Sequence, residues 1–526
     1  MSRKFHHMLA AVALLLPGTA CTDLTLEPKS DPTDVNVFND PSAYRAFIAR
    51  VYSGLAVSGQ QGAAGNPDIQ GIDEGFSQYL RLYWEHEELP TDEAVIGWGD
   101  VGLPELNTQL WAVDNNFVAA MYYRIFFQVV MANEFLRQTT DAKLDARGNV
   151  GPALRADIQQ YRAEARFLRA LSLWHGIDMF GDIPLLTEDD LLGTLPQQST
   201  RAEIYDFLVT ELNAIKADLP VAGPANYGRA SAPAADMLLA KLYLNAQVYT
   251  GTPRYAEALT AAQAVISSGF YSLDTNFQRM FLADNHTSPE VIFPVIQDGV
   301  HTQTWGGMTF LVHAACGGSM SAGTYGIDGC WWGLRLRPEA YNRYAATDTR
   351  AGSFYTTGQS VAIGSIGDFT HGIAAPKFQN VTSTGAAGSH PTHVDTDFPM
   401  FRLADAYLMY AEANLRGGGG NATTALNYVN DLRVRAYGDS SGVITAPELT
   451  LDFILDERSR ELLWEGHRRT DLVRYGRFTG NGYLWAWKGG AQAGTSTPAH
   501  LDLYPIPSNE LIANPNLHQN PGYPGS

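Results

Sequence analysis

The sequence is poor in basic residues and in cysteine. Its 526 residues include 55 Asp and Glu but only 36 Lys and Arg, which gives a formal net charge of -19 at pH 7. Proteins that bind nucleic acids need clusters of Lys and Arg to neutralise phosphates, and the sequence contains no such cluster. We therefore exclude nucleic acid as a partner. With 45% hydrophobic residues, the chain can nevertheless bury a large core.

The chain also lacks the short motifs of the common enzyme classes. It contains no HExxH, no GxSxG at a strand-turn-helix, no Walker loop and no Cys/His metal pattern, so we predict neither a cofactor nor a metal site. Glycoside hydrolysis needs two carboxylates whose separation is spatial and is not visible in a sequence. Asp92 and Glu93 are the best local pair. A glycan hydrolase therefore stays an alternative, although we predict that the protein is not an enzyme.

The N-terminus has the form of an export signal. Two basic residues precede a short apolar run, Met8–Leu16, and small residues then lead to Cys21. The run is too short to span a bilayer. A bacterial lipoprotein signal has this form, with Cys21 as the lipidated first residue of the mature chain, and an ordinary secretory signal is the alternative. Residues 1–20 are excluded from the fold in both cases, and residues 21–40 are predicted to be an extended tether.

Only two other cysteines exist, Cys316 and Cys330. In an exported protein, an isolated pair this close in sequence is consistent with a disulfide. Closing a loop of about 15 residues would stabilise the fold by roughly 3 kcal/mol in the loop-entropy model. Two buried free thiols are the alternative. A disulfide would also brace the loop that leads to Trp331 and would reduce the cost of ordering it on ligand binding.

Helical periodicity flanks a central segment that lacks it. Apolar residues recur at spacings of three and four, which indicates amphipathic helices. The predicted helices cover about 115–138, 157–178, 200–218, 232–269 and 397–414. Residues 270–396 are rich in Gly, Ser and Thr and are predicted to form loops and a few short strands. We expect one domain, 41–526, with a helical scaffold at about 41–269 and 397–526 and a loop-rich insertion at about 270–396.

A six-residue motif occurs twice in the scaffold. Leu239-Ala-Lys-Leu-Tyr-Leu244 matches Leu403-Ala-Asp-Ala-Tyr-Leu408 at Leu, Ala, Tyr and Leu, and a helix with Ala-Leu follows each copy after a loop. Small Ala residues beside Tyr and Leu let two helices approach closely, as in tetratricopeptide-type units. We therefore expect a mainly α-helical fold in which tetratricopeptide-like helix pairs are interrupted by irregular, loop-rich insertions.

A strongly charged helix is predicted at Asp456–Arg474. Glu457, Glu461 and Glu465 recur at four-residue spacing, and like charges at this spacing repel unless other charges offset them. The same segment offers four arginines for this purpose: Arg458, Arg460, Arg468 and Arg469. We interpret the cluster as a structural ion network that holds the scaffold, rather than as a catalytic site.

Several segments, in this order, resemble the SusD/RagB family of bacterial surface nutrient-binding lipoproteins. They are Glu87–Val95, Gly97-Trp-Gly-Asp100, Phe180-Gly-Asp-Ile-Pro-Leu185, the helix pair of 397–433, the charged helix and Tyr504-Pro-Ile-Pro507. The resemblance extends over nearly the whole chain and implies a SusD-like fold. Members of the family capture an oligomeric nutrient, usually a glycan, at the cell surface. They deliver it to a SusC-like TonB-dependent transporter in the outer membrane.

The resemblance thus implies a lipid-anchored outer-membrane protein that faces the cell exterior. Its implied partners are an oligosaccharide and the SusC-like transporter, and its implied anchor is Cys21. Two further alternatives remain open beside the hydrolase. One is the capture of a peptide or glycopeptide by the same architecture, and the other is an adaptor that uses its helix pairs only to hold other proteins.

Aromatic residues in Gly-rich loops are the candidate ligand-binding residues. They are Trp98, Trp305, Tyr325, Trp331 and Trp332. An exposed aromatic ring offers an apolar face for the C–H face of a sugar, and it loses little conformational entropy on binding. In the SusD-like family an arc of aromatics from comparable loops binds glycan, and Trp98 matches the Gly/Trp loop of the family. Asp92 joins the candidate set. For each Trp, packing within its own loop is the alternative.

Overall fold

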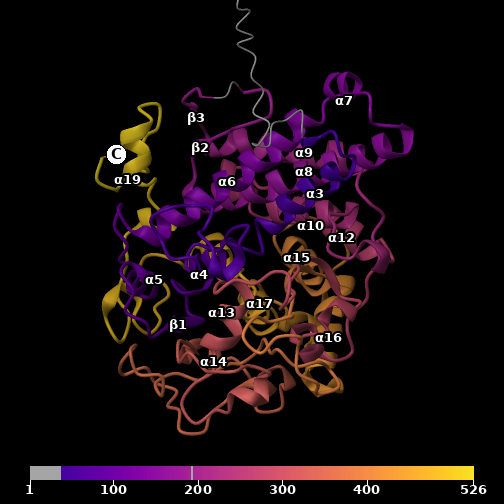
Figure 1. Ribbon diagram of the computed structural model, residues 1–526. Coiled ribbons are helices and arrows are strands. Elements are labelled where there is room, and N and C mark those ends of the chain that lie inside the picture. Colours follow the sequence, from indigo (N-terminus) through magenta and orange to yellow (C-terminus); the bar gives the residue numbers. More distant parts are fainter. Residues whose placement is uncertain (1–36, 191–192, 526) are drawn as a thin grey trace, which may run out of the picture.

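The computed structural model describes residues 37–190 and 193–525. The predicted signal peptide, Cys21 and most of the predicted tether lie outside these residues. Helices make up most of the regular structure, and Figure 1 shows their arrangement. Their bounds are α3 (Ser42–Ser53), α4 (Tyr79–Glu88), α5 (Leu103–Thr108), α6 (Asn116–Gln138), α7 (Asp141–Arg147), α8 (Pro152–Phe180), α9 (Arg201–Ile215), α10 (Ala232–Leu244), α11 (Ala246–Thr250), α12 (Tyr255–Ser267), α13 (Gly307–Ala314), α14 (Pro338–Tyr341), α15 (Leu403–Leu415), α16 (Ala422–Tyr437), α17 (Leu451–Leu462), α18 (Arg468–Arg474) and α19 (Ser508–Ala513).

Helix pairs build the scaffold, as the repeated motif predicts. α10 packs against α12, α15 packs against α16, and α12 also packs against α15, so that two helix hairpins stack on each other. The motif lies in α10 and in α15, where its Ala side chains are buried. α6, α8 and α9 continue the array. The prediction of a mainly α-helical fold is confirmed.

One charged position of the repeated motif joins the two hairpins. Lys241 and Asp405 occupy equivalent places in the two copies, and their buried side chains form an ion pair. The second carboxylate oxygen of Asp405 accepts a hydrogen bond of 2.8 Å from Arg458. Loss of one partner would leave an uncompensated charge in the interior, which is strongly destabilising. The two copies of the motif therefore contact each other at the position where one has Lys241 and the other has Asp405.

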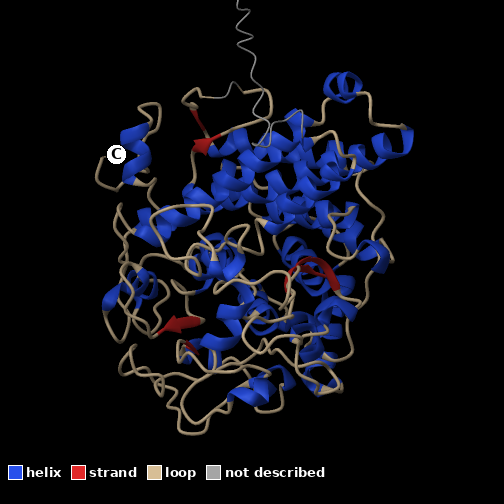
Figure 2. Ribbon diagram, in the orientation of Figure 1, coloured by secondary structure: helices blue, strands red, loops and turns tan. Residues whose placement is uncertain are grey.

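Short antiparallel strands pair segments that are far apart in the chain. β1 (Ala94–Ile96) pairs with β5 (Leu334–Leu336), β2 (Ile183–Pro184) with β3 (Gln198–Ser199), and β4 (Val291–Val295) with β6 (Phe398–Arg402). Figure 2 shows the helices concentrated in the upper part of the view and long loops in the lower part. These loops belong largely to the segment between α12 and α15, so that they cover one end of the helical body.

The charged segment forms two helices, α17 and α18, and not the single helix predicted at Asp456–Arg474. The chain breaks at Trp464 and Gly466, whose φ angles are +61° and +74°. Gly466 tolerates this conformation because it has no Cβ. The indole of Trp84 donates a hydrogen bond of 2.9 Å to the carbonyl of Trp464, and Glu88 accepts one of 2.7 Å from the N–H of Gly466. Helix α4 therefore holds the break in place.

The carboxylates of this segment lie in a buried ion network, as predicted. Most of the cations that face them come from other segments: Lys377, Arg350, Arg402, Arg433 and Arg435. Of the four arginines named from the sequence, Arg460 contacts Glu457. The other three pair with Asp405, Asp471, Asp92, Glu93, Glu87 and Asp178. The network thus connects the helical body to the loop-rich segment.

A single large hydrophobic cluster extends from Ile48 to Tyr523 and includes residues of both the helical body and the loop-rich segment. The loops are therefore packed onto the body and not suspended from it. Within residues 37–190 and 193–525, none of the helices has the combination of length and hydrophobicity that a bilayer-spanning helix requires.

Candidate functional site: a cluster of three tryptophans

The pairing of β1 with β5 brings Trp98 and Trp331 together. The strands are antiparallel and Ile96 faces Leu334, so the residues that follow β1 lie beside the residues that precede β5. The N–H of Gly97 continues the ladder with a hydrogen bond of 3.0 Å to the carbonyl of Gly333. As a result, the indole N–H of Trp98 donates to the carbonyl of Trp331 at 3.0 Å. This bond fixes the orientation of the Trp98 ring.

Trp305 reaches the same place from the loop that precedes α13. Its backbone N–H donates to Glu74 at 3.0 Å, and the neighbouring Thr304 hydroxyl donates to the other oxygen of that carboxylate at 2.8 Å. A Cβ added to Gly75 would lie 2.8 Å from the Cβ of Trp305. The missing side chain of Gly75 therefore lets the Trp305 loop approach this closely. Glu74 anchors the loop, and the indole remains 42% exposed.

The three rings form a continuous aromatic surface, which we call the platform (Trp98, Trp305 and Trp331). The ring centroids of Trp98 and Trp331 are 6.3 Å apart, and those of Trp331 and Trp305 are 6.2 Å apart. Successive ring planes are inclined by 46° and 44°. Successive rings of the platform therefore do not share one plane. Trp98 and Trp331 are partly buried, and Trp305 is the most exposed.

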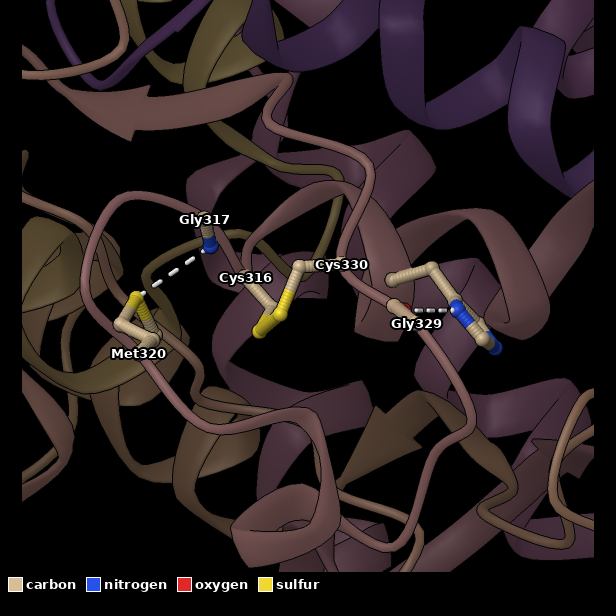
Figure 3. The surroundings of a disulfide bond; sticks show 6 residues. Cys316, Gly317, Met320, Gly329 and Cys330 are labelled. Carbon is tan, nitrogen blue, oxygen red and sulfur yellow. Dashed lines mark hydrogen bonds between the residues drawn. A yellow bond between two sulfur atoms is a disulfide. The ribbon is translucent and has the colours of Figure 1, made fainter.

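Helix α13 and a disulfide support the Trp331 end of the platform, and Figure 3 shows the disulfide with its surroundings. Cys316 and Cys330 are joined by the disulfide, which holds the residue before Trp331 against the end of α13. The backbone N–H of Trp331 donates to the carbonyl of His313 at 2.9 Å, and that of Gly333 donates to Ala314 at 2.9 Å. The last carbonyls of a helix have no partner within it, so α13 offers the acceptors that this strand-like segment uses.

The polar side chains of His313 and Arg81 pack against rings of the platform. The imidazole of His313 stacks on Trp331 with centroids 4.5 Å apart, and its two ring nitrogens lie 2.7 and 2.8 Å from the carbonyls of Gly329 and Thr392. Burial lowers the pKa of His313. The guanidinium of Arg81 lies 5.5 Å from the centre of the Trp98 ring, a cation–π arrangement. Both groups fix rings that would otherwise have to be ordered by a ligand.

Two further aromatic candidates lie elsewhere. Trp332 is 52% exposed, but its ring packs against Phe369 at 5.9 Å, and we find no ring contact between it and the three platform indoles among the described residues. Its φ of +57° is unusual for a bulky residue. Tyr325 is 9% exposed, and burial raises the pKa of its hydroxyl. Neither residue belongs to the platform.

Asp92, the remaining candidate ligand-binding residue, does not lie at the surface. Its side chain is fully buried and is bound by Arg468 at 2.7 and 2.8 Å, by Arg343 and by the Tyr483 hydroxyl. Burial alone would raise the pKa of Asp92, but the two arginines hold it below its ordinary value. Glu93 is buried beside it. A carboxylate pair that is enclosed and charge-paired in this way cannot reach a ligand, so Asp92 is a structural residue.

Sequence reasoning missed the residues that hold the indoles. His313 stands within an apolar stretch, Met308–Ala315, and a lone His in such a stretch is a signal for a buried, hydrogen-bonded imidazole. His393 contacts Trp305 with ring centroids 5.1 Å apart. Within the described residues, no group of three or more His, Cys, Asp or Glu side chains is placed to hold a metal ion. The site thus consists of rings and hydrogen-bonding groups.

Known proteins match this chain in both sequence and structure. A model of the SusD family matches residues 291–523. The starch-binding protein SusD of Bacteroides thetaiotaomicron is 35% identical, and the alignment covers 98% of each chain. The chain belongs to the SusD family. The SusD-like protein P25 of Formosa agariphila is 27% identical over 68% of this chain and 71% of its own. The resemblance inferred from the sequence motifs is confirmed.

Solved structures share the fold of this SusD family member. A SusD superfamily protein of Bacteroides thetaiotaomicron superposes with a TM-score of 0.71 at 21% identity, over 91% of this chain and 99% of that one. Surface glycan-binding protein A of the same organism, solved in complex with laminarihexaose, gives a TM-score of 0.69 at 22% identity, over 91% and 98% of the two chains. Both agree with the mainly helical architecture described above.

Proposed function

We propose that the protein binds oligosaccharides at the platform and captures them without breaking a bond. The observation that carries this proposal is the platform of Trp98, Trp331 and Trp305, three indoles in contact at one place, of which Trp305 is substantially exposed. Exposed apolar rings are stabilised when a ligand removes them from water. Alternating apolar faces and hydroxyl groups make a sugar chain suitable for such a surface.

The sequence similarity to a starch-binding protein supports a glucan as the ligand. That relative is similar over 98% of this chain. The inclination of about 45° between successive rings also suits a chain that curves, because each sugar residue can meet a differently oriented indole. We therefore take a starch-type glucan, a chain of neutral glucose residues, as the first candidate ligand.

The proposal includes delivery to a transporter at the cell surface. Family members act as lipid-anchored partners of SusC-like TonB-dependent transporters in the outer membrane, and Cys21 is the candidate lipidation site in this chain. A binding protein of this kind needs affinity without turnover. The burial of Asp92 and Glu93 within ion pairs removes the best local carboxylate pair from a hydrolytic role.

Calorimetric titration with maltoheptaose tests the proposal. Trp305→Ala removes the most exposed indole of the platform, and loss of an aromatic contact of this kind costs about 2 kcal/mol, or ~30-fold in Kd. Trp332→Ala is the matched control, because it removes an exposed indole outside the platform and should change Kd less than twofold. Chromatography of the sugar after incubation should recover intact maltoheptaose. Equal affinities of wild type and Trp305→Ala, or the release of shorter sugars, would contradict the proposal.

A further inference from the structure

A cavity that the platform residues do not line contains several acidic side chains. Its volume is about 460 Å³, within the range of small-molecule sites. We call it the acidic cavity. Three carboxylates line it (Asp298, Asp395 and Asp397), together with Gln297 and the rings of Tyr227 and His286; Ile296 and Val300 contribute exposed apolar surface.

Two carboxylates of this cavity, those of Asp395 and Asp397, have no Lys or Arg partner among the described residues. By contrast, the buried carboxylates of Asp92 and Asp405 face arginine or lysine. Within the described residues, neither Asp395 nor Asp397 forms an ion pair, and no Lys or Arg lines the cavity. Neutral donors bind Asp395 and Asp397 instead, and the imidazole of His301, which also lines the cavity, lies 2.9 Å from Asp298.

These neutral donors hold the carboxylates in fixed orientations. Asp397 accepts hydrogen bonds of 2.7 Å from the N–H of Gln297 and of 2.7 Å from the hydroxyl of Tyr227. Asp395 accepts bonds of 2.8 Å from the N–H of Gly299 and of 2.6 Å from the hydroxyl of Ser389. Because each oxygen has further acceptor capacity, these carboxylates are prepared to accept hydrogen bonds from a ligand.

A hydrogen-bond donor without a partner lies in the same cavity. Gln297 is 5% exposed and lines the cavity, and its amide nitrogen has no partner among the described residues. An unsatisfied buried polar group costs about 1–3 kcal/mol. A ligand for this cavity should therefore both donate, to the carboxylates, and accept, from the amide. A hydroxyl group does both, whereas a metal cation or an ammonium group cannot accept a hydrogen bond.

The walls suit the apolar faces of a sugar. The rings of Tyr227 and His286 meet edge to face with centroids 6.3 Å apart, and Ile296 and Val300 are 42% and 55% exposed. The cavity thus combines apolar walls with polar side chains that bind hydroxyl groups. Its charge should exclude sugars that carry carboxylate or sulfate.

The chain connects this cavity to the platform. The segment 296–305 begins at the cavity and ends at Trp305, and the segment 389–397 supplies Ser389 and Asp395 to the cavity. Between these two residues, His393 contacts Trp305 and stacks on His390 at 5.2 Å. The same two segments therefore border both places, so that one extended ligand could follow them.

We propose that the acidic cavity is a second saccharide subsite, which binds neutral sugar residues of the glycan held by the platform and rejects anionic ones. This inference rests on the proposed glycan binding. It adds a specificity determinant that is distinct from the three indoles, and it assigns to Gln297, Asp298 and Asp397 the recognition of hydroxyl groups.

Calorimetric titration of variants separates the two places. The platform variant is Trp305→Ala/Trp331→Ala, and the cavity variant is His286→Ala/Asp298→Asn. An Asn at position 298 can still accept the N–H groups of Val300 and His301 that Asp298 accepts at 2.8 and 2.9 Å, so the turn is kept. His518→Ala/Asp114→Asn is the matched control, because both residues are exposed and lie outside both places.

We expect the platform variant to retain weak binding of maltotriose, and we expect addition of the cavity substitutions to abolish it. The platform variant should not bind a trimer of galacturonic acid. In the otherwise wild-type protein, the cavity substitutions should weaken maltoheptaose binding at least fivefold, and the control should not.

Three outcomes overturn the inference. They are a platform variant that binds no maltotriose at millimolar concentration, maltotriose binding that survives the cavity substitutions, and equal binding of the anionic trimer. If the cavity variant matches wild type while the platform variant loses maltoheptaose, the proposed function stands and this subsite does not. If platform substitutions have no effect and cavity substitutions abolish binding, the platform is wrong and the cavity is the site.

Discussion

Replacement of Arg402 by Met should destabilise the protein more than any surface charge change. The guanidinium is 1% exposed and contacts Glu290, Glu461 and Glu465 at 2.9, 2.7 and 2.6 Å. Removing one partner from a buried pair costs about 3–5 kcal/mol, because the remaining charge stays in the interior without compensation. Met retains an unbranched chain as far as the position of Nε, so that the packing of the Arg402 stem is kept and mainly the guanidinium is lost.

The remaining cations place the expected loss near the lower end of that range. Glu461 retains Arg350 and Arg435, and Glu465 retains Lys377. We therefore expect a loss of about 3 kcal/mol in the free energy of unfolding, a large share of the ~5–15 kcal/mol typical of folded proteins. Equilibrium unfolding in urea, followed by tryptophan fluorescence, measures it. Urea is preferred to guanidinium because it adds no ionic strength.

The pH dependence gives an independent check. Burial alone would raise the pKa of Glu461, but Arg435, Arg402 and Arg350 together hold it below its ordinary value. A carboxyl with a lowered folded-state pKa stabilises the protein above its unfolded pKa of about 4.5, and this contribution is lost as the pH falls. Without Arg402, Glu461 is protonated at a higher pH. The deficit of Arg402→Met should therefore shrink between pH 7 and pH 3.5.

Arg155→Met is the matched control. Arg155 pairs with Asp141 and Asp145, whose side chains are 89% and 70% exposed, and exposed pairs contribute about 0–1 kcal/mol. The reasoning is refuted if Arg402→Met loses less than about 1 kcal/mol at pH 7, if Arg155→Met is equally damaging, or if the deficit of Arg402→Met is the same at both pH values.

Two further predictions concern the loop-rich segment. Cys316→Ser/Cys330→Ser should lower the free energy of unfolding by about 3 kcal/mol. It should also weaken maltoheptaose binding, since the disulfide holds the chain before Trp331. An unchanged Kd in calorimetry would show that the disulfide does not preorganise the platform. Burial raises the pKa of Asp397 to about 7. Between about pH 4 and 7 this group is therefore protonated in the folded protein but ionised in the unfolded chain. The free energy of unfolding should fall by at most about 4 kcal/mol as the pH rises through that window. Asp397→Asn should remove this part of the pH dependence in urea titrations at pH 5 and pH 8, and an unchanged slope would contradict the raised pKa. Asp395, Asp298, Tyr227, His286 and His301 face the same cavity and are kept in both proteins.

Local sequence patterns predicted the parts of the fold that depend on interactions between residues close together in the chain. Apolar periodicity located the long helices, and the repeated motif identified α10 and α15 as equivalent members of two helix pairs. The break between α17 and α18 was missed, because it depends on hydrogen bonds with Trp84 and Glu88 in α4, which lie far away in the sequence.

The same limit explains what was missed in the site. Gly-rich loops around Trp98, Trp305 and Trp331 marked these residues as candidates, but their convergence depends on the pairing of β1 with β5, two strands of three residues each. Asp92 was misplaced because its partners, Arg343 and Arg468, are distant in the chain. A carboxylate can be recognised as structural only when the cations that neutralise it are known.

A crystal structure of the protein with bound maltoheptaose tests the central claim most directly. The account predicts an intact glucan that lies across the indoles of Trp98, Trp331 and Trp305 with its sugar rings in contact with their faces. A glucan bound at another surface, with the three indoles free of contact, or a cleaved sugar in the site would contradict it.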